Sequence, residues 1–121
     1  MGLILVVEDH EDTAYVLLKM LKQWGHDTIS AGTGEAGLAL LADQKPDLII
    51  VDGMMPGMNG VEFIRLIRAG AATSMIPAIL YTAVADPAFT DNALEKGANE
   101  IWIKGLVEMD QMKARIDHYL H

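Results

Sequence analysis

Five short apolar runs alternate with segments of helical periodicity along the chain, and this alternation limits the possible folds more than any other feature. The runs cover residues 3–7, 28–31, 48–51, 78–81 and 101–103. Between them, apolar side chains recur with the spacing of an amphipathic helix. Strands joined by helices of ten or more residues form a parallel sheet, because each crossover lays a helix on the sheet. The pattern predicts a doubly wound α/β domain.

The segments between the runs also carry helix start and stop signals. Thr33 suits an N-cap position, and Pro87 suits the first turn of a helix. Gly25 and Gly97 suit the left-handed position that follows a last turn. The predicted helices cover residues 13–24, 34–42, 61–69, 87–96 and 109–119.

The run at 48–51 is apolar throughout, as a parallel strand buried on both faces should be, yet it ends on the carboxylate of Asp52. In doubly wound sheets the binding site lies beyond the carboxyl ends of the strands. Polar residues follow four of the five predicted strands at this edge, namely Glu8 and Asp9, Asp52, Thr82 and Lys104. The predicted site therefore combines three carboxylates, one hydroxyl and one amine.

Three carboxylates at one edge of a sheet require a positive partner. Two like unit charges 4 Å apart repel by about 4 kcal/mol at an effective dielectric constant near 20. Carboxylate oxygens suit Mg²⁺, which prefers one or two such ligands together with water and phosphate, and Lys104 can supply a further point charge. The acids therefore predict a magnesium site.

Composition excludes several other classes of function. The chain has 121 residues, 51% of them apolar, which suffices for the core of one domain. The lack of cysteine excludes disulfides and thiolate metal ligands and favours a cytoplasmic location. A net charge of −8 with scattered bases should repel nucleic acid, so we expect no direct contact with it. No apolar stretch approaches the roughly 20 residues of a membrane span, and no basic leader precedes Glu8.

Four segments of the chain resemble the receiver domains of two-component response regulators. They are ILVVEDH at 4–10, PDLIIVDGMMPGMNG at 46–60, IPAILYTA at 76–83 and KGANEIWIKG at 96–105. The resemblance spans essentially the whole chain and implies a single receiver domain at 1–121. It also implies a flavodoxin-like, five-stranded parallel sheet in the order 2-1-3-4-5 with helices on both faces.

The same resemblance implies a role for each polar residue at the sheet edge. Asp52 matches the phosphoacceptor, which takes a phosphoryl group from a histidine kinase or a phosphotransfer protein. The implied site comprises the magnesium ligands Glu8, Asp9, Asp52 and the backbone carbonyl of Met54, and the phosphoryl-contacting Thr82 and Lys104. Phosphorylation would change the surface that a downstream protein, unidentified from the sequence, recognises.

Sheet geometry offers a check that does not depend on motif matching. Neighbouring strands lie about 4.8 Å apart, so in this strand order the short side chains of Asp9 and Thr82 flank Asp52 from adjacent strands. Lys104 starts two strands away, roughly 10 Å, and needs its long stem to reach the site.

A carboxylate nucleophile is ionised at neutral pH, so we expect no general base.

Two positions depart from the family pattern. Gly105 stands where receivers usually carry proline after the lysine, often with a cis peptide bond, so we expect a trans bond here. Ile101 stands where the family usually carries a rotating tyrosine or phenylalanine. Trp102 is one position on and, by strand alternation, should face the other side of the sheet. Coupling of Thr82 to an aromatic rotation on the last strand is therefore not expected.

Two alternatives remain beside a phosphorylated signalling module. One is a receiver-like interaction domain that works without phosphorylation. The other is a Mg²⁺-dependent phosphohydrolase with Asp52 as nucleophile, but Met54 stands where such enzymes commonly place a second acid. We therefore expect no turnover of an external substrate. No DNA-binding or catalytic segment follows Leu120, so we expect the output to lie outside this chain.

Several other polar and sulfur-containing residues have simpler interpretations. Glu11 and Asp12 are expected to complement a helix dipole rather than bind metal. The four histidines lack metal-ligand spacing and are expected to be solvated, at positions 10, 26, 118 and 121. The methionines at 54, 55 and 58 are expected to pack within their loop.

Overall fold

The computed structural model of the chain describes residues 2–120, in which five strands alternate with five helices. In chain order the elements are β1 (Leu3–Val7), α1 (Glu11–Gln23), β2 (Asp27–Ala31), α2 (Gly34–Asp43), β3 (Leu48–Asp52), α3 (Gly60–Ala69), β4 (Ala78–Thr82), α4 (Pro87–Glu95), β5 (Glu100–Ile103) and α5 (Met109–Leu120). Every predicted strand and helix is present, and each end lies within two residues of the expected position.

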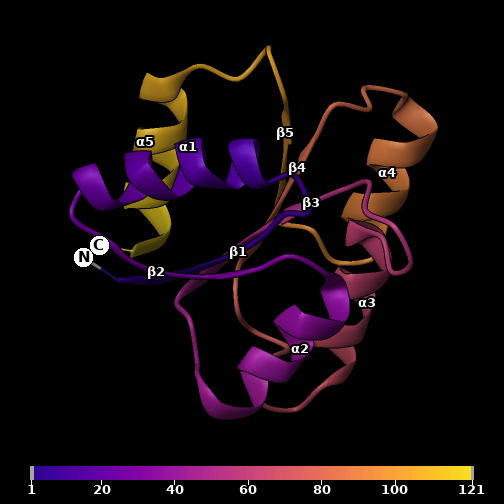
Figure 1. The fold of residues 1–121 in the computed structure, drawn as a ribbon. Coiled ribbons are helices and arrows are strands. Elements are labelled where there is room, and N and C mark those ends of the chain that lie inside the picture. The colour runs from indigo at the N-terminus through magenta and orange to yellow at the C-terminus, as the bar shows by residue number, and fades with distance from the viewer. Residues whose placement is uncertain (1, 121) are drawn as a thin grey trace.

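The strands form one parallel sheet in the order β2-β1-β3-β4-β5, which confirms the predicted doubly wound, flavodoxin-like topology. Helices α1 and α5 cover one face, while α2, α3 and α4 cover the other (Figure 1). The strand order reverses between β1 and β3, so the loops after these two strands border the same crevice. The fold thus brings the segments that follow Val7 and Val51 together.

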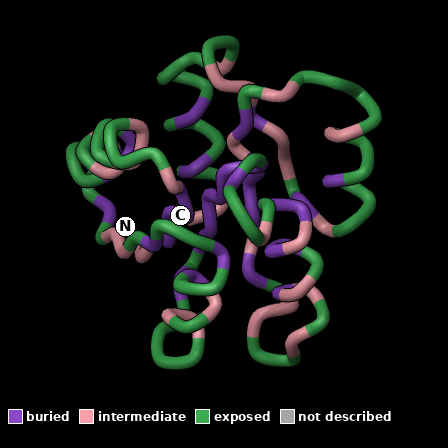
Figure 2. Tube along the Cα trace, turned by 45° about the vertical axis from the view of Figure 1, so that its right-hand side comes forward, coloured by how far each residue is buried: buried purple, intermediate pink, exposed green. Residues whose placement is uncertain are grey.

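The core lies on both faces of the sheet, because successive strand residues point in opposite directions. In β1, Ile4 and Val6 belong to the apolar cluster under α1 and α5, whereas Leu5 and Val7 belong to the cluster under the other three helices. Buried segments accordingly run through the middle of the molecule (Figure 2). With β3 buried along its full length, including Asp52, the sheet gives the site a rigid base.

Side-chain caps and glycines fix the helix ends as the sequence predicts. The Thr33 hydroxyl accepts a 3.0 Å hydrogen bond from the backbone N–H of Ala36 and caps α2. Gly25 and Gly97 adopt φ values of 93° and 120°, which residues with a side chain rarely adopt. Among residues 2–120, no helix is long and apolar enough to cross a membrane.

The two departures from the family pattern have the predicted structural consequences. The described residues contain no cis peptide bond, and Gly105 instead adopts a φ of 85°. Trp102 packs into the cluster under α1 and α5, while Ile101 packs against the cluster on the opposite face. The Trp102 side chain therefore lies on the opposite face of the sheet from position 101, where receivers usually carry tyrosine or phenylalanine.

The prediction that the histidines are solvated is wrong for His26. Its side chain is buried at the turn from α1 into β2, and neither ring nitrogen has a hydrogen-bond partner. Burial lowers the pKa of this imidazole, because it penalises the charged form. His118 and His10 are exposed as expected, and His121 lies outside the described residues.

The prediction that three methionines pack within their loop is wrong for one of them. Met55 is buried and Met58 packs against the core, but Met54 is 54% exposed. The contact of Met54 with the neighbouring Asp52 is made by its backbone, whose N–H donates a hydrogen bond to the Asp52 carboxylate.

Candidate functional site

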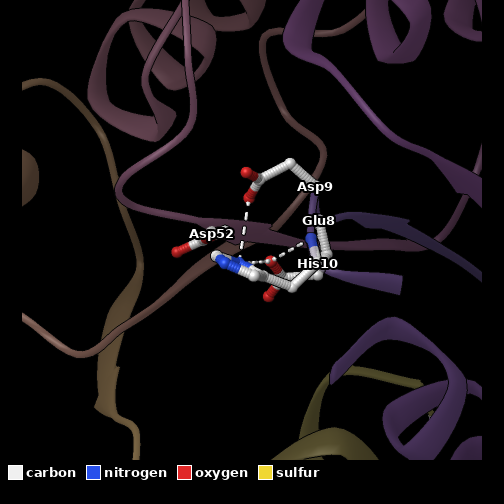
Figure 3. A group of neighbouring side chains, drawn as sticks. All are labelled: Glu8, Asp9, His10 and Asp52. Atoms are coloured by element: carbon white, nitrogen blue, oxygen red, sulfur yellow. Dashed lines mark hydrogen bonds and ion pairs between the residues drawn. The ribbon is translucent and has the colours of Figure 1, made fainter. Parts of the chain in front are cut away.

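The sheet register brings the predicted acids to one point. Val7 pairs with Val51 in the register of β1 and β3, so Glu8 and Asp52, the next residues, stand side by side. Glu8, Asp9, His10 and Asp52 each offer one ligand atom, and these atoms all lie within 4.8 Å of one another (Figure 3). Three of the four were predicted from the sequence, and His10 is an addition.

Lys104 reaches this cluster from β5, across β4. Its Nζ donates a 2.8 Å hydrogen bond to Glu8 Oε1 and lies 3.5 Å from Asp52 Oδ1. The expectation that a long stem spans two strands is therefore confirmed. The Nζ also lies 5.3 Å from the centre of the Tyr81 ring, close enough for a cation–π contact. The amine thus has two carboxylates and one aromatic ring around it.

Asp52 is almost enclosed, with 4% of its surface exposed. Burial raises the pKa of its carboxyl to about 6, and the neighbouring Glu8 adds to this effect. Lys104 and the Met54 backbone N–H, which donates a 3.2 Å hydrogen bond to Oδ1, oppose it. Asp52 is therefore mostly ionised at neutral pH, but with a much smaller margin than an ordinary aspartate has.

Glu8 shifts in the opposite direction. Burial favours its neutral form, but hydrogen bonds from the Lys104 amine and the His10 backbone N–H outweigh burial and lower the pKa of Glu8. Burial likewise opposes the charge on Lys104, and the two carboxylates more than offset it, so the pKa of the amine is raised. The two neighbouring acids are therefore shifted in opposite directions, with the pKa of Asp52 raised and that of Glu8 lowered.

Thr82 closes the other side of the site. It is the last residue of β4 and is completely buried. Asp52 pairs with Tyr81 in the register of β3 and β4, which places Thr82 one residue beyond Asp52 on the adjacent strand. The Thr82 hydroxyl oxygen accepts a 3.1 Å hydrogen bond from the Val84 N–H, which leaves the hydroxyl proton free for donation.

Gly53 is required where the chain leaves β3. A Cβ at this position would lie 2.8 Å from both the Cβ and the hydroxyl oxygen of Thr82, and 3.1 Å from the Phe89 ring. Real Cβ atoms essentially never approach another atom to less than 3.0 Å, so the Thr82 side chain would have to shift. Gly53 therefore lets the loop after Asp52 pack directly on Thr82.

Asp9 and His10 complete the described site. Asp9 Oδ1 is buried and accepts no hydrogen bond, although His10 Nδ1 lies 3.4 Å away, an ion-pair distance for a charged imidazole. An orphaned carboxylate oxygen beside two further acids fits a divalent cation, because oxygen ligands suit Mg²⁺. The predicted Met54 carbonyl ligand stays a prediction, since its described contact to Asp52 is made by its N–H group.

Sequence reasoning missed two residues of the site. His10 was set aside because it has no partner at metal-ligand spacing along the chain, whereas its partners are the adjacent acids. Tyr81 has the appearance of an ordinary strand residue, and only the path of the Lys104 stem across β4 brings the ring to the amine. The signal available for His10 was its position directly after two predicted ligands.

Comparison with known sequences finds the family that the four sequence segments resemble. A sequence model of the family described as "Response regulator receiver domain" matches residues 4–117. Protein PilH of Pseudomonas aeruginosa is 40% identical over 82 residues, which is 68% of either chain. The transcriptional regulatory protein AfsQ1 of Streptomyces coelicolor is 40% identical over 101 residues, 84% of this chain but 44% of that protein. The chain thus spans less than half the length of AfsQ1.

Solved structures show the same fold. The signal receiver domain of a signal transduction histidine kinase from Syntrophus aciditrophicus superposes with a TM-score of 0.91 at 31% identity, covering 99% of this chain and 90% of that one. The chemotaxis protein CheY4 of Vibrio cholerae has a TM-score of 0.90 at 23% identity, covering 98% of each chain. These matches confirm the predicted architecture over nearly the full chain.

Proposed function

Because the chain belongs to the response regulator receiver domain family, we propose that it accepts a phosphoryl group on Asp52 and changes its interaction surface in response. Receiver domains are signalling modules of two-component systems rather than metabolic enzymes. The proposal adds a donor, which is a histidine kinase or a phosphotransfer protein, and an unidentified downstream protein. It treats residues 1–121 as one receiver domain acting in the cytoplasm without membrane or nucleic-acid contact of its own.

The observation that carries the proposal is a buried carboxylate, that of Asp52, beside the Lys104 ammonium group. Asp52 lies at the end of β3 with 4% of its surface exposed, and Lys104 Nζ lies 3.5 Å from its Oδ1. A carboxylate oxygen of Asp52 attacks phosphorus and forms a P–O bond, while the bond to the donor breaks and its electron pair leaves with the donor. The Lys104 ammonium stabilises the negative charge on the transferred phosphoryl oxygens.

The residues present fit Mg²⁺. Glu8, Asp9, Asp52 and the Met54 carbonyl would hold the ion, and the Asp9 oxygen without a hydrogen bond supports this assignment. When bound, Mg²⁺ supplies charge neutralisation for the phosphoryl oxygens and for the clustered acids. A cation held there would also oppose the effect of burial on the pKa of Asp52, so that its carboxylate would be more fully ionised.

Thr82 is the proposed sensor of phosphorylation. Its hydroxyl proton is free to be donated, and its oxygen accepts a hydrogen bond from the backbone N–H of Val84, in the loop that leads into α4. Donation of that proton to a phosphoryl oxygen would draw the loop toward the site and shift an equilibrium between two surface states. With Ile101 in place of an aromatic residue, the shift proceeds without an aromatic rotation on β5.

Acetyl phosphate, a small phosphodonor, tests the proposal without knowledge of the kinase. We expect incubation with acetyl phosphate and Mg²⁺ to add one phosphoryl group to the intact protein, measured by mass spectrometry. Asp52→Asn should abolish the increment, and the matched control Asp12→Asn, at an exposed acid of α1, should retain it. An increment that persists in Asp52→Asn contradicts the assignment, and no increment in the parent favours an interaction domain that works without phosphorylation.

A further inference from the structure

We infer that His10 is a nitrogen ligand of the cation site and gives this site a preference for transition-metal cations, represented by Zn²⁺, over Mg²⁺. The inference rests on the proposed function, because the acids involved are the proposed magnesium ligands. It goes beyond that function by naming a fourth protein side chain and a second class of cation.

The distances around the imidazole match those between ligands of one ion. His10 Nδ1 lies 3.4 Å from Asp9 Oδ1 and 3.5 Å from Glu8 Oε2. Two ligand atoms bound at 2.0–2.2 Å, at angles between those of an octahedron and a tetrahedron, lie about 3 to 3.6 Å apart. The three side chains can therefore share one ion with little movement, and Figure 3 shows the ring turned toward both acids.

The imidazole has no other structural task. His10 occupies the N-cap position of α1, yet its side chain makes no capping hydrogen bond, and 71% of that side chain is exposed. Its backbone N–H donates a 3.1 Å hydrogen bond to Glu8 Oε2, which fixes the residue against the acid. Beside the ring, Asp9 Oδ1 is buried without a hydrogen-bond partner. Asp9 Oδ1, which accepts no hydrogen bond, thus faces the Nδ1 atom of His10.

The chemistry of the ligands sets the preference. Carboxylates and carbonyls suit Mg²⁺, whereas imidazole suits Zn²⁺ and Cu²⁺. Affinity for a site with nitrogen rises along the first-row series from Mn²⁺ to Cu²⁺ and is lower again for Zn²⁺. Lys104 opposes any divalent cation through its charge and so does not distinguish between the two metals. A ring nitrogen beside Glu8 and Asp9 should therefore strengthen Zn²⁺ binding much more than Mg²⁺ binding.

The test measures cation binding with no phosphodonor present. Isothermal titration of chelator-treated protein with Zn²⁺ and with Mg²⁺ compares the parent with His10→Ala, Asp9→Asn and His118→Ala, an exposed histidine on α5 that serves as matched control. We expect His10→Ala to raise the Kd for Zn²⁺ by at least about tenfold and to leave that for Mg²⁺ within about twofold. His118→Ala should change neither, and Asp9→Asn should weaken both.

A second readout separates ligation from a change in folding. In ¹⁵N spectra of the parent, the Nδ1 resonance of His10 should shift on addition of Zn²⁺ and stay in place with Mg²⁺. An unchanged Zn²⁺ affinity in His10→Ala, or an equal loss for both cations, overturns the inference. Loss of Zn²⁺ binding in His10→Ala but not in Asp9→Asn also overturns the inference. That result would mean that Zn²⁺ binds to His10 as an isolated surface histidine, without the neighbouring acid. If Asp9→Asn affects neither metal, the proposed cation site itself fails.

Discussion

Lys104 Nζ donates its 2.8 Å hydrogen bond to Glu8, not to Asp52, from which it stands 3.5 Å away. The amine therefore balances the charge of Glu8, the acid beside Asp52, and leaves Asp52 without a direct hydrogen bond from Lys104. This relationship has two consequences. Glu8 stays ionised although it is buried, and Lys104 can approach a group on Asp52 by a small displacement.

Removal of the amine should destabilise the fold and slow phosphorylation. Lys104→Met leaves Glu8 and Asp52 buried without their cation, at a cost of about 2 kcal/mol in the free energy of unfolding near neutral pH. The rate of modification by acetyl phosphate should fall at least about tenfold, since one charge-stabilising donor is lost. Urea unfolding and timed mass spectrometry measure the two effects. Lys113→Met, at an exposed position of α5, is the control, and an equal loss there would refute the assignment.

Asp52→Asn should stabilise the protein at neutral pH. The folded-state pKa of Asp52 is raised from 3.8 to about 6, so the native state binds a proton more tightly than the unfolded chain does. Ionisation of Asp52 therefore lowers the free energy of unfolding as the pH rises from 3.8 to about 6, and the loss of stability persists above that range. Asparagine, which resembles the neutral acid, should recover up to about 3 kcal/mol near pH 7.5.

The gain from Asp52→Asn should vanish at about pH 4, where the parent carboxyl is protonated in the folded state. Urea unfolding at both pH values, without divalent cations, measures the difference. A loss of stability near neutral pH would show that the ionised carboxylate is stabilised by its neighbours instead.

Proline at position 105, the residue that most receivers carry there, should destabilise this chain. Gly105 has a φ of 85°, whereas proline fixes φ near −65°. Gly105→Ala should cost about 1–2 kcal/mol, because a side chain disfavours the left-handed region, although a Cβ there meets open space. Gly105→Pro should cost more than Gly105→Ala in urea unfolding. A neutral or stabilising proline would mean that the loop after Lys104 has another conformation.

Gly53→Ala should disturb Thr82. The new methyl group would stand 2.8 Å from the threonine side chain, and the displacement should cost about 1–3 kcal/mol. Gly32→Ala is the matched control, because a Cβ there meets nothing within 4 Å and its φ is not in the left-handed region. We expect Gly53→Ala to lower the urea midpoint clearly and Gly32→Ala to leave it nearly unchanged. Equal midpoints for the two variants would contradict the close packing of Gly53 on Thr82.

The element order and most of the site were predictable from the sequence, because both follow from short-range patterns. The buried run before Asp52 and the glycine at position 25 each fix local backbone structure, and parallel strands bring their carboxyl ends to one edge. The strand order came from family resemblance, since periodicity does not determine which strands are neighbours. The reach of Lys104 was then predictable from strand spacing alone.

The remaining features depend on long-range or local three-dimensional contacts. Burial of His26 results from the way the chain turns back after α1, and no pattern of spacing indicates it. The raised pKa of Asp52 depends on how closely Glu8 approaches, and the contact between Tyr81 and Lys104 depends on the path of one side chain. His10 shows a further limit, because two acids that precede it in the sequence do not reveal which way the next ring turns.

Chemical trapping of the modified residue tests the central claim most directly. Borohydride reduces an acyl phosphate on an aspartate to homoserine, which tandem mass spectrometry of peptides can locate. After treatment with acetyl phosphate and Mg²⁺, homoserine should be found at position 52 and at no other acidic residue. Unreduced Asp52 together with a reduced side chain at Glu8 or Asp9, or no reduced residue in a protein that has gained a phosphoryl group, would contradict the account.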